Sequence, residues 1–399
     1  MRPRIPLRWV AMGVFALSST LNYMDRLLLA AAAPLLEHDF HLSNRDYGLL
    51  LSAVSIAYAL SAPLMGLFLD RLGLNRGVSL AVAFWSVAGA ATGLARNFSQ
   101  LVGCRVSLSV FQAAGIPSSG KASATYLESK ELALGAALNQ LGLSLGGIAA
   151  PIVVGWMAPA YGWPSAFYFC GLLGFAWIPV WLWMAQRAPK QAVVAGSRQF
   201  AVGDLLRDRR FWSLLAATVF AMMVYTLWSN WTTLYFVESR RMTQVEANRR
   251  FAWIPPLFAT LGGAAGGALA FRWIRGGVAV LSARLRVCLL SALFVLATAA
   301  VPLMPSPGWA AAAISVSYFW SVCLSTNLYV MPIDLFGPGR AAFGVAALTF
   351  AYGLMQTFAS PAIGSLVDRF GFGSVCAGVS VLPLASVGIL RWGVLPARA

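Results

Sequence analysis

Charged residues are scarce in this chain, making up 11% of its 399 residues, where soluble domains usually have about 25%. Hydrophobic residues make up 59%, so too few polar residues remain to cover a water-soluble surface of this size. The shortage is greatest for acids, with 13 Asp and Glu against 29 Lys and Arg. The composition excludes a soluble globular protein and indicates a basic membrane protein.

Histidine and cysteine are few, and their positions do not suggest a reactive centre. The two histidines lie in one predicted loop, and the five cysteines lie singly in apolar segments without paired spacing. We therefore expect no disulfide framework, no metal site and no cofactor. The sequence shows no nucleophile–base constellation, which predicts that the protein is not an enzyme. Basic residues are spread over short loops, so nucleic acid is not an expected partner.

Long apolar runs, in contrast, recur along the whole chain. Their lengths of about 18–27 residues suit helices that cross a hydrocarbon core of about 30 Å. Twelve such runs are predicted, at 8–35, 46–69, 78–95, 100–125, 131–157, 163–186, 211–237, 249–274, 283–301, 308–332, 340–366 and 373–394. The sequence therefore predicts an all-α membrane protein of three parts. These are an N-terminal six-helix half (1–186), a polar cytoplasmic linker (187–210) and a C-terminal six-helix half (211–399).

The distribution of Lys and Arg predicts the orientation in the membrane. If the N-terminus is cytoplasmic, most of the 29 Lys and Arg residues lie in cytoplasmic segments. This asymmetry follows the positive-inside rule and places both termini in the cytoplasm. Short loops and Ala- and Arg-rich usage favour a bacterial inner membrane. The lipid bilayer is the expected environment, and we expect a monomer.

Three charged residues are predicted to lie inside the membrane. Arg105 falls within the uncharged run 100–120, and Asp25 and Arg26 fall within the apolar stretch 7–36. A charge at such depth costs at least about 2.5–3.5 kcal/mol on insertion, so these residues indicate a function. Neighbouring residues point about 100° apart around a helix, so Asp25 and Arg26 can face different sides. Two buried Arg against one Asp predict a cavity that attracts anions.

The two halves contain similar glycine patterns. Gly155 and Gly162 are matched by Gly364 and Gly371, and such echoes suit the repeated halves of secondary transporters. The glycine-rich run 262–267 is interpreted as a helix-packing surface and not as a phosphate loop, because it lies mid-membrane.

Two motifs resemble a known family. The segment Gly66-Leu-Phe-Leu-Asp-Arg-Leu-Gly-Leu-Asn-Arg76 resembles the signature loop of the major facilitator superfamily. Asn22-Tyr-Met-Asp-Arg26 resembles the Asn-Tyr-x-Asp-Arg motif of its anion:cation symporter branch. That branch includes hexuronate and galactonate transporters and sialin. The resemblance implies twelve helices in two halves and transport of carboxylates such as sugar acids.

The run 100–125 also resembles the branch, with one departure. The family pattern has an Arg followed seven residues later by a proton-coupling Glu. This chain has Arg105 in the first position and Gln112 in the second. Because a carboxamide cannot titrate, Asp25 is left as the expected proton-coupling residue. The resemblance also implies substrate contacts, which we expect from Arg26, Arg105, Tyr23, Tyr58, Gln112 and Gln140.

Gating residues are expected around the signature loop. Gly66 is expected to allow close helix approach. Asp70 is expected to dock at a helix N-terminus beside Arg340. The predicted gating set is Gly66, Asp70, Arg71, Arg76 and Arg340.

The predicted function is secondary active transport of a small organic anion, a sugar acid or another carboxylate, by alternating access and proton-coupled symport. The anion and the proton are the expected partners. The alternative left open by Gln112 is an organic-anion uniporter or exchanger without proton coupling.

Overall fold

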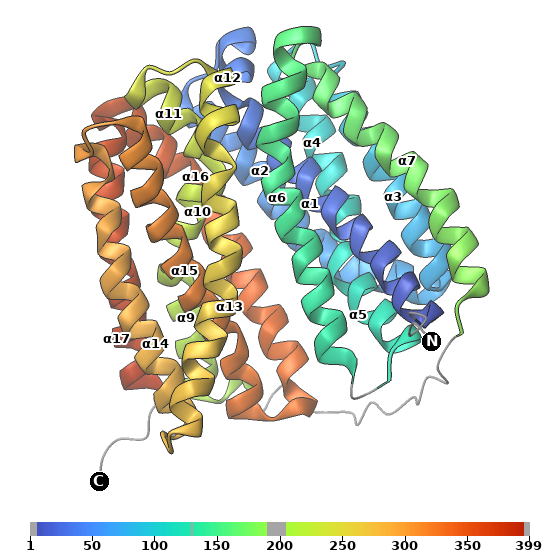
Figure 1. The fold of residues 1–399 in the computed structure, drawn as a ribbon, viewed down its shortest axis with the longest axis vertical. Helices are drawn as coiled ribbons and strands as arrows, with labels where there is room; N and C mark the ends of the chain where they lie inside the picture. The colour runs from blue at the N-terminus through green and yellow to red at the C-terminus, as the bar shows by residue number, and fades with distance from the viewer. Residues whose placement is uncertain (1–5, 129–130, 190–204, 395–399) are drawn as a thin grey trace, which may run out of the picture. The chain divides into compact units, whose positions relative to one another are not determined.

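The computed structural model describes residues 6–128, 131–189 and 205–394, and all regular structure in these ranges is helical (Figure 1). The first seven helices are α1 (Leu7–Phe40), α2 (Asn44–Leu72), α3 (Leu74–Thr92), α4 (Phe98–Gln112), α5 (Gly115–Tyr126), α6 (Leu132–Tyr161) and α7 (Pro164–Arg187). The next are α9 (Arg209–Ala221), α10 (Met223–Asn230), α11 (Thr232–Arg240), α12 (Gln244–Glu246) and α13 (Ile254–Arg275), with a π-helical stretch at Ala247–Ala252. The last are α14 (Val280–Val295), a 3-10 stretch at Leu296–Leu303, α15 (Pro307–Phe336), α16 (Pro338–Ser380) and α17 (Leu382–Gly393).

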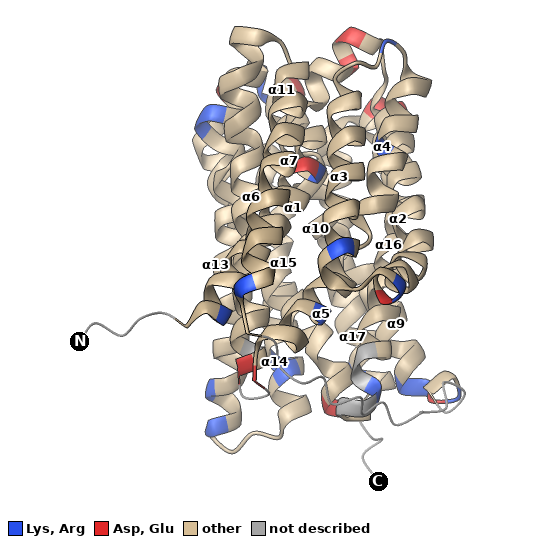
Figure 2. Cartoon of the chain, turned by 90° about the vertical axis from the view of Figure 1, so that its right-hand side faces the viewer, with Lys and Arg blue, Asp and Glu red and all other residues tan. Residues whose placement is uncertain are grey.

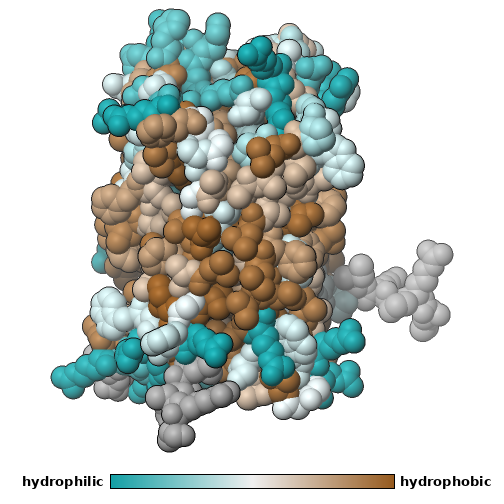
Figure 3. Space-filling view, turned by 90° about the vertical axis from the view of Figure 1, so that its left-hand side faces the viewer, coloured by the Kyte–Doolittle hydropathy of each residue, from teal (hydrophilic) through white to brown (hydrophobic). Residues whose placement is uncertain are grey.

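The surface suits a hydrocarbon environment. Among the described residues, eight helices are long and apolar enough to cross a membrane. On the face drawn in Figure 3, apolar side chains gather in a broad central band and polar ones lie at both ends. Charged residues are likewise concentrated towards the ends of the helices, with few between them (Figure 2). Exposed side chains such as Leu293 and Phe294 would be costly in water and suit contact with lipid.

The chain forms two compact units. Unit 1 comprises the described residues within Met1–Leu42, Ala53–Ala195 and Thr243–Trp253, and unit 2 comprises the remainder. The units therefore follow the two predicted halves apart from two short segments. The predicted linker at 187–210 lies mostly outside the described residues, and the predicted division there stays a prediction.

In unit 1, α1 lies directly against α6 through glycine. A Cβ atom at Gly142 would overlap the carbonyl oxygen of Ala16, and one at Gly146 would overlap that of Thr20. In lipid, the hydrophobic effect does not drive helices together. Small residues let membrane helices approach closely, so that van der Waals contact stabilises their association. The core of this unit also contains Trp181, which meets Phe15 edge-on at 5.6 Å between ring centroids.

In unit 2, α13 and α15 also pack closely at glycine residues. A Cβ atom at Gly262 would overlap the carbonyl oxygen of Phe319, and one at Gly266 would lie 2.8 Å from the Cα of Cys323. The predicted packing role of the run 262–267 is confirmed by these contacts. The predicted similarity of the halves also appears in two turns, where Gly162 and Gly371 adopt φ values of 77° and 72°.

Two short segments, Ser43–Ser52 and Thr243–Trp253, belong to the unit formed by the other half of the chain, and polar contacts hold each of them there. The first turns of α2 belong to unit 2, where the backbone N–H groups of Asn44 and Arg45 donate to the carboxylate of Asp368 at 3.1 and 3.0 Å. A carboxylate at the N-terminus of a helix accepts hydrogen bonds from backbone N–H groups that have no partner within the helix. Its negative charge also interacts favourably with the helix dipole. The segment Thr243–Trp253 belongs to unit 1, where Asn248 donates to the carbonyl oxygen of Ala31 at 2.8 Å.

Some predicted spans are interrupted helices. The span predicted at 100–125 divides into α4, which ends at Gln112, and α5, which begins at Gly115. The span predicted at 211–237 divides at Met222 and again at Trp231. Transporters commonly place discontinuous helices at their binding sites, so Gln112 and Met222, which lie at these breaks, are candidates for residues near a binding site.

Gly146→Ala is expected to destabilise the protein, because the added methyl group would overlap the carbonyl oxygen of Thr20. Overpacking of this kind costs about 1–3 kcal/mol. Gly13→Ala in α1 is the matched control, since its Cβ would meet nothing within 4 Å. The measurement is the midpoint of thermal unfolding in detergent. Equal midpoints for the two variants would contradict the close α1–α6 contact.

Candidate functional site

The intramembrane charges of α1 face two different sides of the helix. Asp25 is 1% exposed, and the charge that acts on its carboxylate is that of Arg105. Arg26 is only partly buried, and its guanidinium carbon lies 5.1 Å from the ring centroid of Tyr58. The 100° step between neighbouring residues is what separates them. Each charge therefore has its own environment.

Asp25 and Arg105 are opposite charges that are buried together in unit 1 and act on each other electrostatically. Arg105 is 1% exposed, donates from its Nη2 to the carbonyl oxygen of Asp25 at 2.8 Å, and lies 5.5 Å from the ring centroid of Phe167. Isolated charges at this depth would cost several kcal/mol each, so the two residues depend on each other.

The carboxylate of Asp25 sits in a niche that the sequence did not reveal. A Cβ atom at Gly89 would lie 3.1 Å from Oδ1, so a larger residue there would crowd the carboxylate. The thiol of Cys170 is the polar group beside Asp25, and neither carboxylate oxygen makes a well-formed hydrogen bond to the described residues. Cys170 lies 145 positions along the chain from Asp25, so no local pattern could have indicated this neighbour.

Gln112 binds α1 and does not stand in an open cavity. It is 2% exposed, and its Nε2 donates to the carbonyl oxygen of Asn22 at 3.0 Å. The Nδ2 of Asn22 donates in return to the carbonyl oxygen of Gln112 at 3.3 Å. Gln112 and Arg105 thus both donate from α4 to backbone carbonyls of α1, on one face of α4. The break between α4 and α5 follows directly after this contact.

The partly exposed side of α1 carries Arg26 and Tyr23. Both act electrostatically on the Tyr58 hydroxyl, which places the three side chains together. The Tyr23 ring lies about one van der Waals contact from Gly147 of α6, where a Cβ atom would be 3.5 Å away. Gln140 is exposed and lies seven residues before Gly147, so it shares that face about two turns away. Tyr23, Arg26 and Tyr58 thus lie together on one face of unit 1, and Gln140 lies about two turns farther along α6.

This face can bind an anion. A guanidinium offers a planar fork of donors that matches a carboxylate, and the neighbouring phenol groups can donate further hydrogen bonds. A partly exposed Arg can reach a solute, whereas the buried Arg105 is enclosed by protein. Of the six predicted substrate contacts, the structure brings Arg26, Tyr23 and Tyr58 together on this face, and Gln140 is exposed about two turns away on α6. The structure places Arg105 and Gln112 behind this face.

The structure describes contacts for part of the predicted gating set. The carboxylate of Asp70 accepts a hydrogen bond from the Nζ of Lys121 at 2.9 Å, and that same Nζ donates to the carbonyl oxygen of Leu69. A Cβ atom at Gly66 would meet nothing within 4 Å among the described residues, and the expected close helix approach there stays a prediction. Arg71 and Arg76 are exposed, and Arg340 is partly buried. A gating role for this set stays a prediction.

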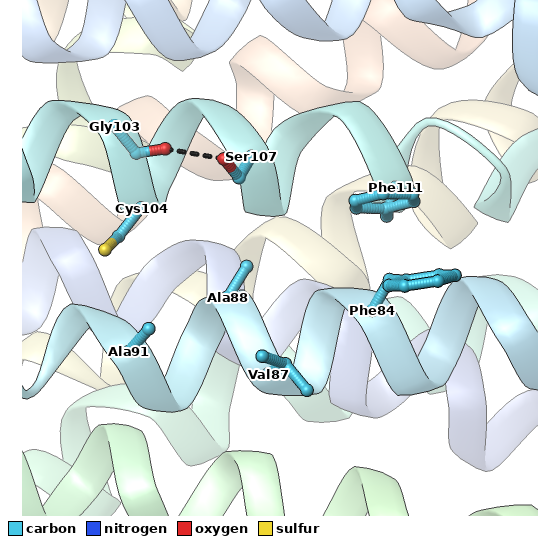
Figure 4. A pocket seen from close by; sticks show the side chains of 8 residues that line it. All are labelled: Phe84, Val87, Ala88, Ala91, Gly103, Cys104, Ser107 and Phe111. Carbon is cyan, nitrogen blue, oxygen red and sulfur yellow. Dashed lines mark hydrogen bonds between the residues drawn. The ribbon is translucent and has the colours of Figure 1, made fainter.

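A pocket between α3 and α4 has no part in this site (Figure 4). Its lining is Phe84, Val87, Ala88, Ala91, Gly103, Cys104, Ser107 and Phe111, and none of these residues is charged. The rings of Phe84 and Phe111 stack at 4.8 Å between centroids. Such a lining suits an apolar neighbour and not a charged solute. Among the described residues, no group of three His, Cys, Asp or Glu side chains is placed to hold a metal ion.

Comparison with known proteins identifies the class of this chain. Residues 15–360 match the model of the Major Facilitator Superfamily, and the chain belongs to that family. It is therefore a membrane transporter and not an enzyme.

Two relatives and one solved structure illustrate the similarity. The hexuronate transporter of Escherichia coli strain K12 is 28% identical over 410 residues, covering 98% of this chain and 94% of that protein. The galacturonate transporter of Dickeya chrysanthemi is 30% identical over 281 residues, covering 65% and 81%. A bacterial homologue of the human lysosomal transporter Spinster shares the fold, with a TM-score of 0.76 at 19% identity, covering 98% and 96%. The predicted resemblance to sugar-acid transporters is confirmed by these relatives.

Arg105→Ala is expected to lower the yield of folded protein, because it leaves the buried Asp25 without its counter-charge. Breaking such a pair costs about 3–5 kcal/mol. The double variant Asp25→Asn with Arg105→Ala removes both charges and should recover much of the loss. The measurement is the fraction of monodisperse protein after size-exclusion chromatography in detergent. A wild-type fraction of monodisperse protein for Arg105→Ala would contradict the mutual dependence of Asp25 and Arg105. A double variant with no larger fraction than Arg105→Ala would contradict it as well.

Proposed function

We propose that the protein is a secondary active transporter of a small organic anion and works by proton-coupled symport. The observation that carries this proposal is Arg26, a partly exposed cation inside α1 with the Tyr58 ring 5.1 Å away. The relatives named hexuronate and galacturonate transporters support a sugar acid or a similar carboxylate as the solute. Tyr23, Tyr58 and Gln140 would complete the contacts to the anion from unit 1.

The membrane topology is part of the same proposal. Beyond the eight apolar helices, α1, α3 and the α4–α5 pair add three spans, and the 51-residue stretch Phe343–Gly393 is long enough for two. This supports twelve spans. The excess of Lys and Arg in alternate loops supports cytoplasmic termini in a bacterial inner membrane.

Asp25 is the proposed proton-coupling residue. It is the acid buried beside Arg105, and its protonation would remove the charge that balances that guanidinium. Arg105 also donates to the backbone of α1 at Asp25, directly before the substrate-binding Arg26. A change in the charge of Asp25 would therefore alter the position of Arg26 through the backbone they share. Proton binding and anion binding would be coupled in this way.

An organic-anion uniporter or exchanger is the second candidate, and Gln112 favours it. Gln112 occupies the position of a titratable Glu in the anion:cation symporter pattern, and here its carboxamide is used to donate to Asn22. Because Gln112 cannot bind a proton, the absence of an acid at this position agrees with anion transport that is not coupled to protons. The pH dependence of accumulation separates the two candidates.

Arg26→Ala is expected to reduce anion uptake at least tenfold, since a charge-assisted contact contributes about 1.5–3 kcal/mol. Arg26→Lys should recover only part of the activity, because an ammonium lacks the two-point grip. The measurement is uptake of labelled hexuronate into proteoliposomes, normalised to the amount of folded protein. Arg96→Ala, at an exposed position, is the control. Wild-type uptake by Arg26→Ala would contradict the proposed site.

Asp25→Asn is expected to abolish accumulation driven by a pH gradient while exchange of anion for anion continues. Gln112→Glu would add a second titratable group on the face that meets α1, and should make uptake depend more steeply on pH. Both effects are measured as accumulation ratios in liposomes at clamped membrane potential. An Asp25→Asn protein that still concentrates the anion with a pH gradient would place coupling elsewhere.

A further inference from the structure

Helix α7 of unit 1 packs closely on α3, and this contact fixes the position of Cys170. A Cβ atom at Gly171 of α7 would lie 2.9 Å from the carbonyl oxygen of Ser86 in α3. A Cβ atom at Gly174 would overlap the Ser86 hydroxyl group. Small residues allow such close approach between membrane helices. Cys170 directly precedes Gly171, so its backbone is held against α3 at this crossing.

Helix α3 also leaves room for the carboxylate of Asp25. A Cβ atom at Gly89 would lie 3.1 Å from Oδ1 and 3.4 Å from Oδ2 of Asp25, and 3.3 Å from the Leu108 side chain. Gly89 follows Ser86 by three residues, so both lie on one face of α3. That face therefore contacts α7 and the Asp25 carboxylate within about one helical turn.

One face of α7 meets both buried charges of unit 1. Phe167 and Cys170 are three residues apart and share a side of the helix. The ring centroid of Phe167 lies 5.5 Å from the guanidinium carbon of Arg105, and the thiol of Cys170 lies beside the carboxylate of Asp25. Cys170 is 1% exposed. Bulk water therefore does not compete for its thiol.

The Asp25 carboxylate has buried acceptor atoms to satisfy. Neither Oδ atom of Asp25 accepts a well-formed hydrogen bond from the described residues. Buried polar atoms are nearly always hydrogen-bonded, and an ionised carboxylate is a strong acceptor. A thiol is a weak donor, and its hydrogen turns about the C–S bond to suit an acceptor. Cys170 is therefore placed to donate to Asp25 once the carboxylate is ionised.

Few other ionisable groups face Asp25. Within the described part of unit 1, the groups that act on its carboxylate are the guanidinium of Arg105 and the thiol of Cys170. Helix α6, which packs along α1, contains no charged residue. The helices α5 and α12 also pack against α1, and their charged side chains bond elsewhere, Lys121 to Asp70 and Glu246 to Thr243.

We propose that Cys170 is a positioning residue for Asp25, whose ionised carboxylate accepts a hydrogen bond from the Cys170 thiol. The inference rests on the proposed proton-coupling role of Asp25 and adds the group that holds its charged form in place. A hydrogen bond to the charged form of an acid favours that form. The thiol therefore assists the release of the proton from Asp25, and Arg105 acts in the same direction through its charge.

The first experiment observes the thiol itself. Infrared difference spectra of the purified protein in lipid are recorded over a range of pH. The S–H stretching band of Cys170 is identified by its absence from Cys170→Ser, and the carboxylic acid band of Asp25 by its absence from Asp25→Asn.

We expect the S–H band of Cys170 to move to lower wavenumber as the carboxylic acid band of Asp25 disappears, because donation weakens the S–H bond. In Asp25→Asn, the S–H band should keep one position at every pH. A band that stays fixed in the wild-type protein, or that moves equally in Asp25→Asn, would overturn the proposal.

The second experiment separates the hydrogen bond from packing. Cys170→Ala removes the donor and should raise the pH at which the Asp25 band is half lost by about half a pH unit. Cys170→Ser keeps a donor, so its midpoint should lie at or below that of the wild type. Cys376→Ala is the control, since it removes a thiol that is 0% exposed in unit 2, and it should leave the midpoint unchanged. Equal shifts in Cys170→Ala and Cys170→Ser, or no shift in either, would count against the thiol as donor.

Uptake measurements distinguish this inference from the proposed function. Uptake of labelled hexuronate into proteoliposomes is measured against external pH for the same variants. If Asp25 couples protons to transport, the pH of half-maximal uptake should rise in Cys170→Ala together with the infrared midpoint. A shifted infrared midpoint with an unchanged uptake profile would support the Cys170 contact and contradict coupling through Asp25. A shifted uptake profile with an unchanged infrared midpoint would overturn the role of Cys170.

Discussion

The cost of holding charge in a low-dielectric interior governs the architecture of unit 1. Asp25 and Arg105 are each 1% exposed, and neither could remain ionised at that depth alone. Their pairing fixes α4 against α1, because the same guanidinium donates to the α1 backbone at 2.8 Å. The reciprocal contact between Gln112 and Asn22 extends this attachment along the same face. Arg26 lies on the other side of α1. Its orientation is fixed because α1 cannot rotate about its axis without separating Asp25 from Arg105.

This arrangement separates two tasks that the sequence places on adjacent residues. Asp25 belongs to the interior, and Arg26 belongs to the face with Tyr23 and Tyr58. In the proposed mechanism, a solute would bind Arg26 without disturbing the buried charges, and a change in the charge of Asp25 would act on Arg26 through the peptide link between the two residues. Coupling of this kind would require no long chain of side chains between the two residues.

The sequence was sufficient for the family, the helical fold and the sidedness of Asp25 and Arg26, because these depend on composition, motif and helix period. It could not place Gln112, since a glutamine on that face can meet either a solute or a backbone carbonyl, and only packing decides between them. Cys170 and Gly89 escaped notice because they come near Asp25 through tertiary structure alone. A signature motif such as the one that begins at Gly66 indicates kinship and does not by itself show what each glycine contacts.

The glycine contacts also determine where this molecule can deform. At Gly142, Gly146 and Gly262, backbone touches backbone with no side chain between them. A helix pair joined in this way has no rotamers with which to accommodate sliding, so α1 with α6, and α13 with α15, should behave as stiff paired rods. Bending during a transport cycle would then concentrate where helices are already interrupted, after Gln112 and at Met222. The first of these places directly follows the contact of Gln112 with α1, so one flexible joint of the protein would lie beside the buried charges of unit 1.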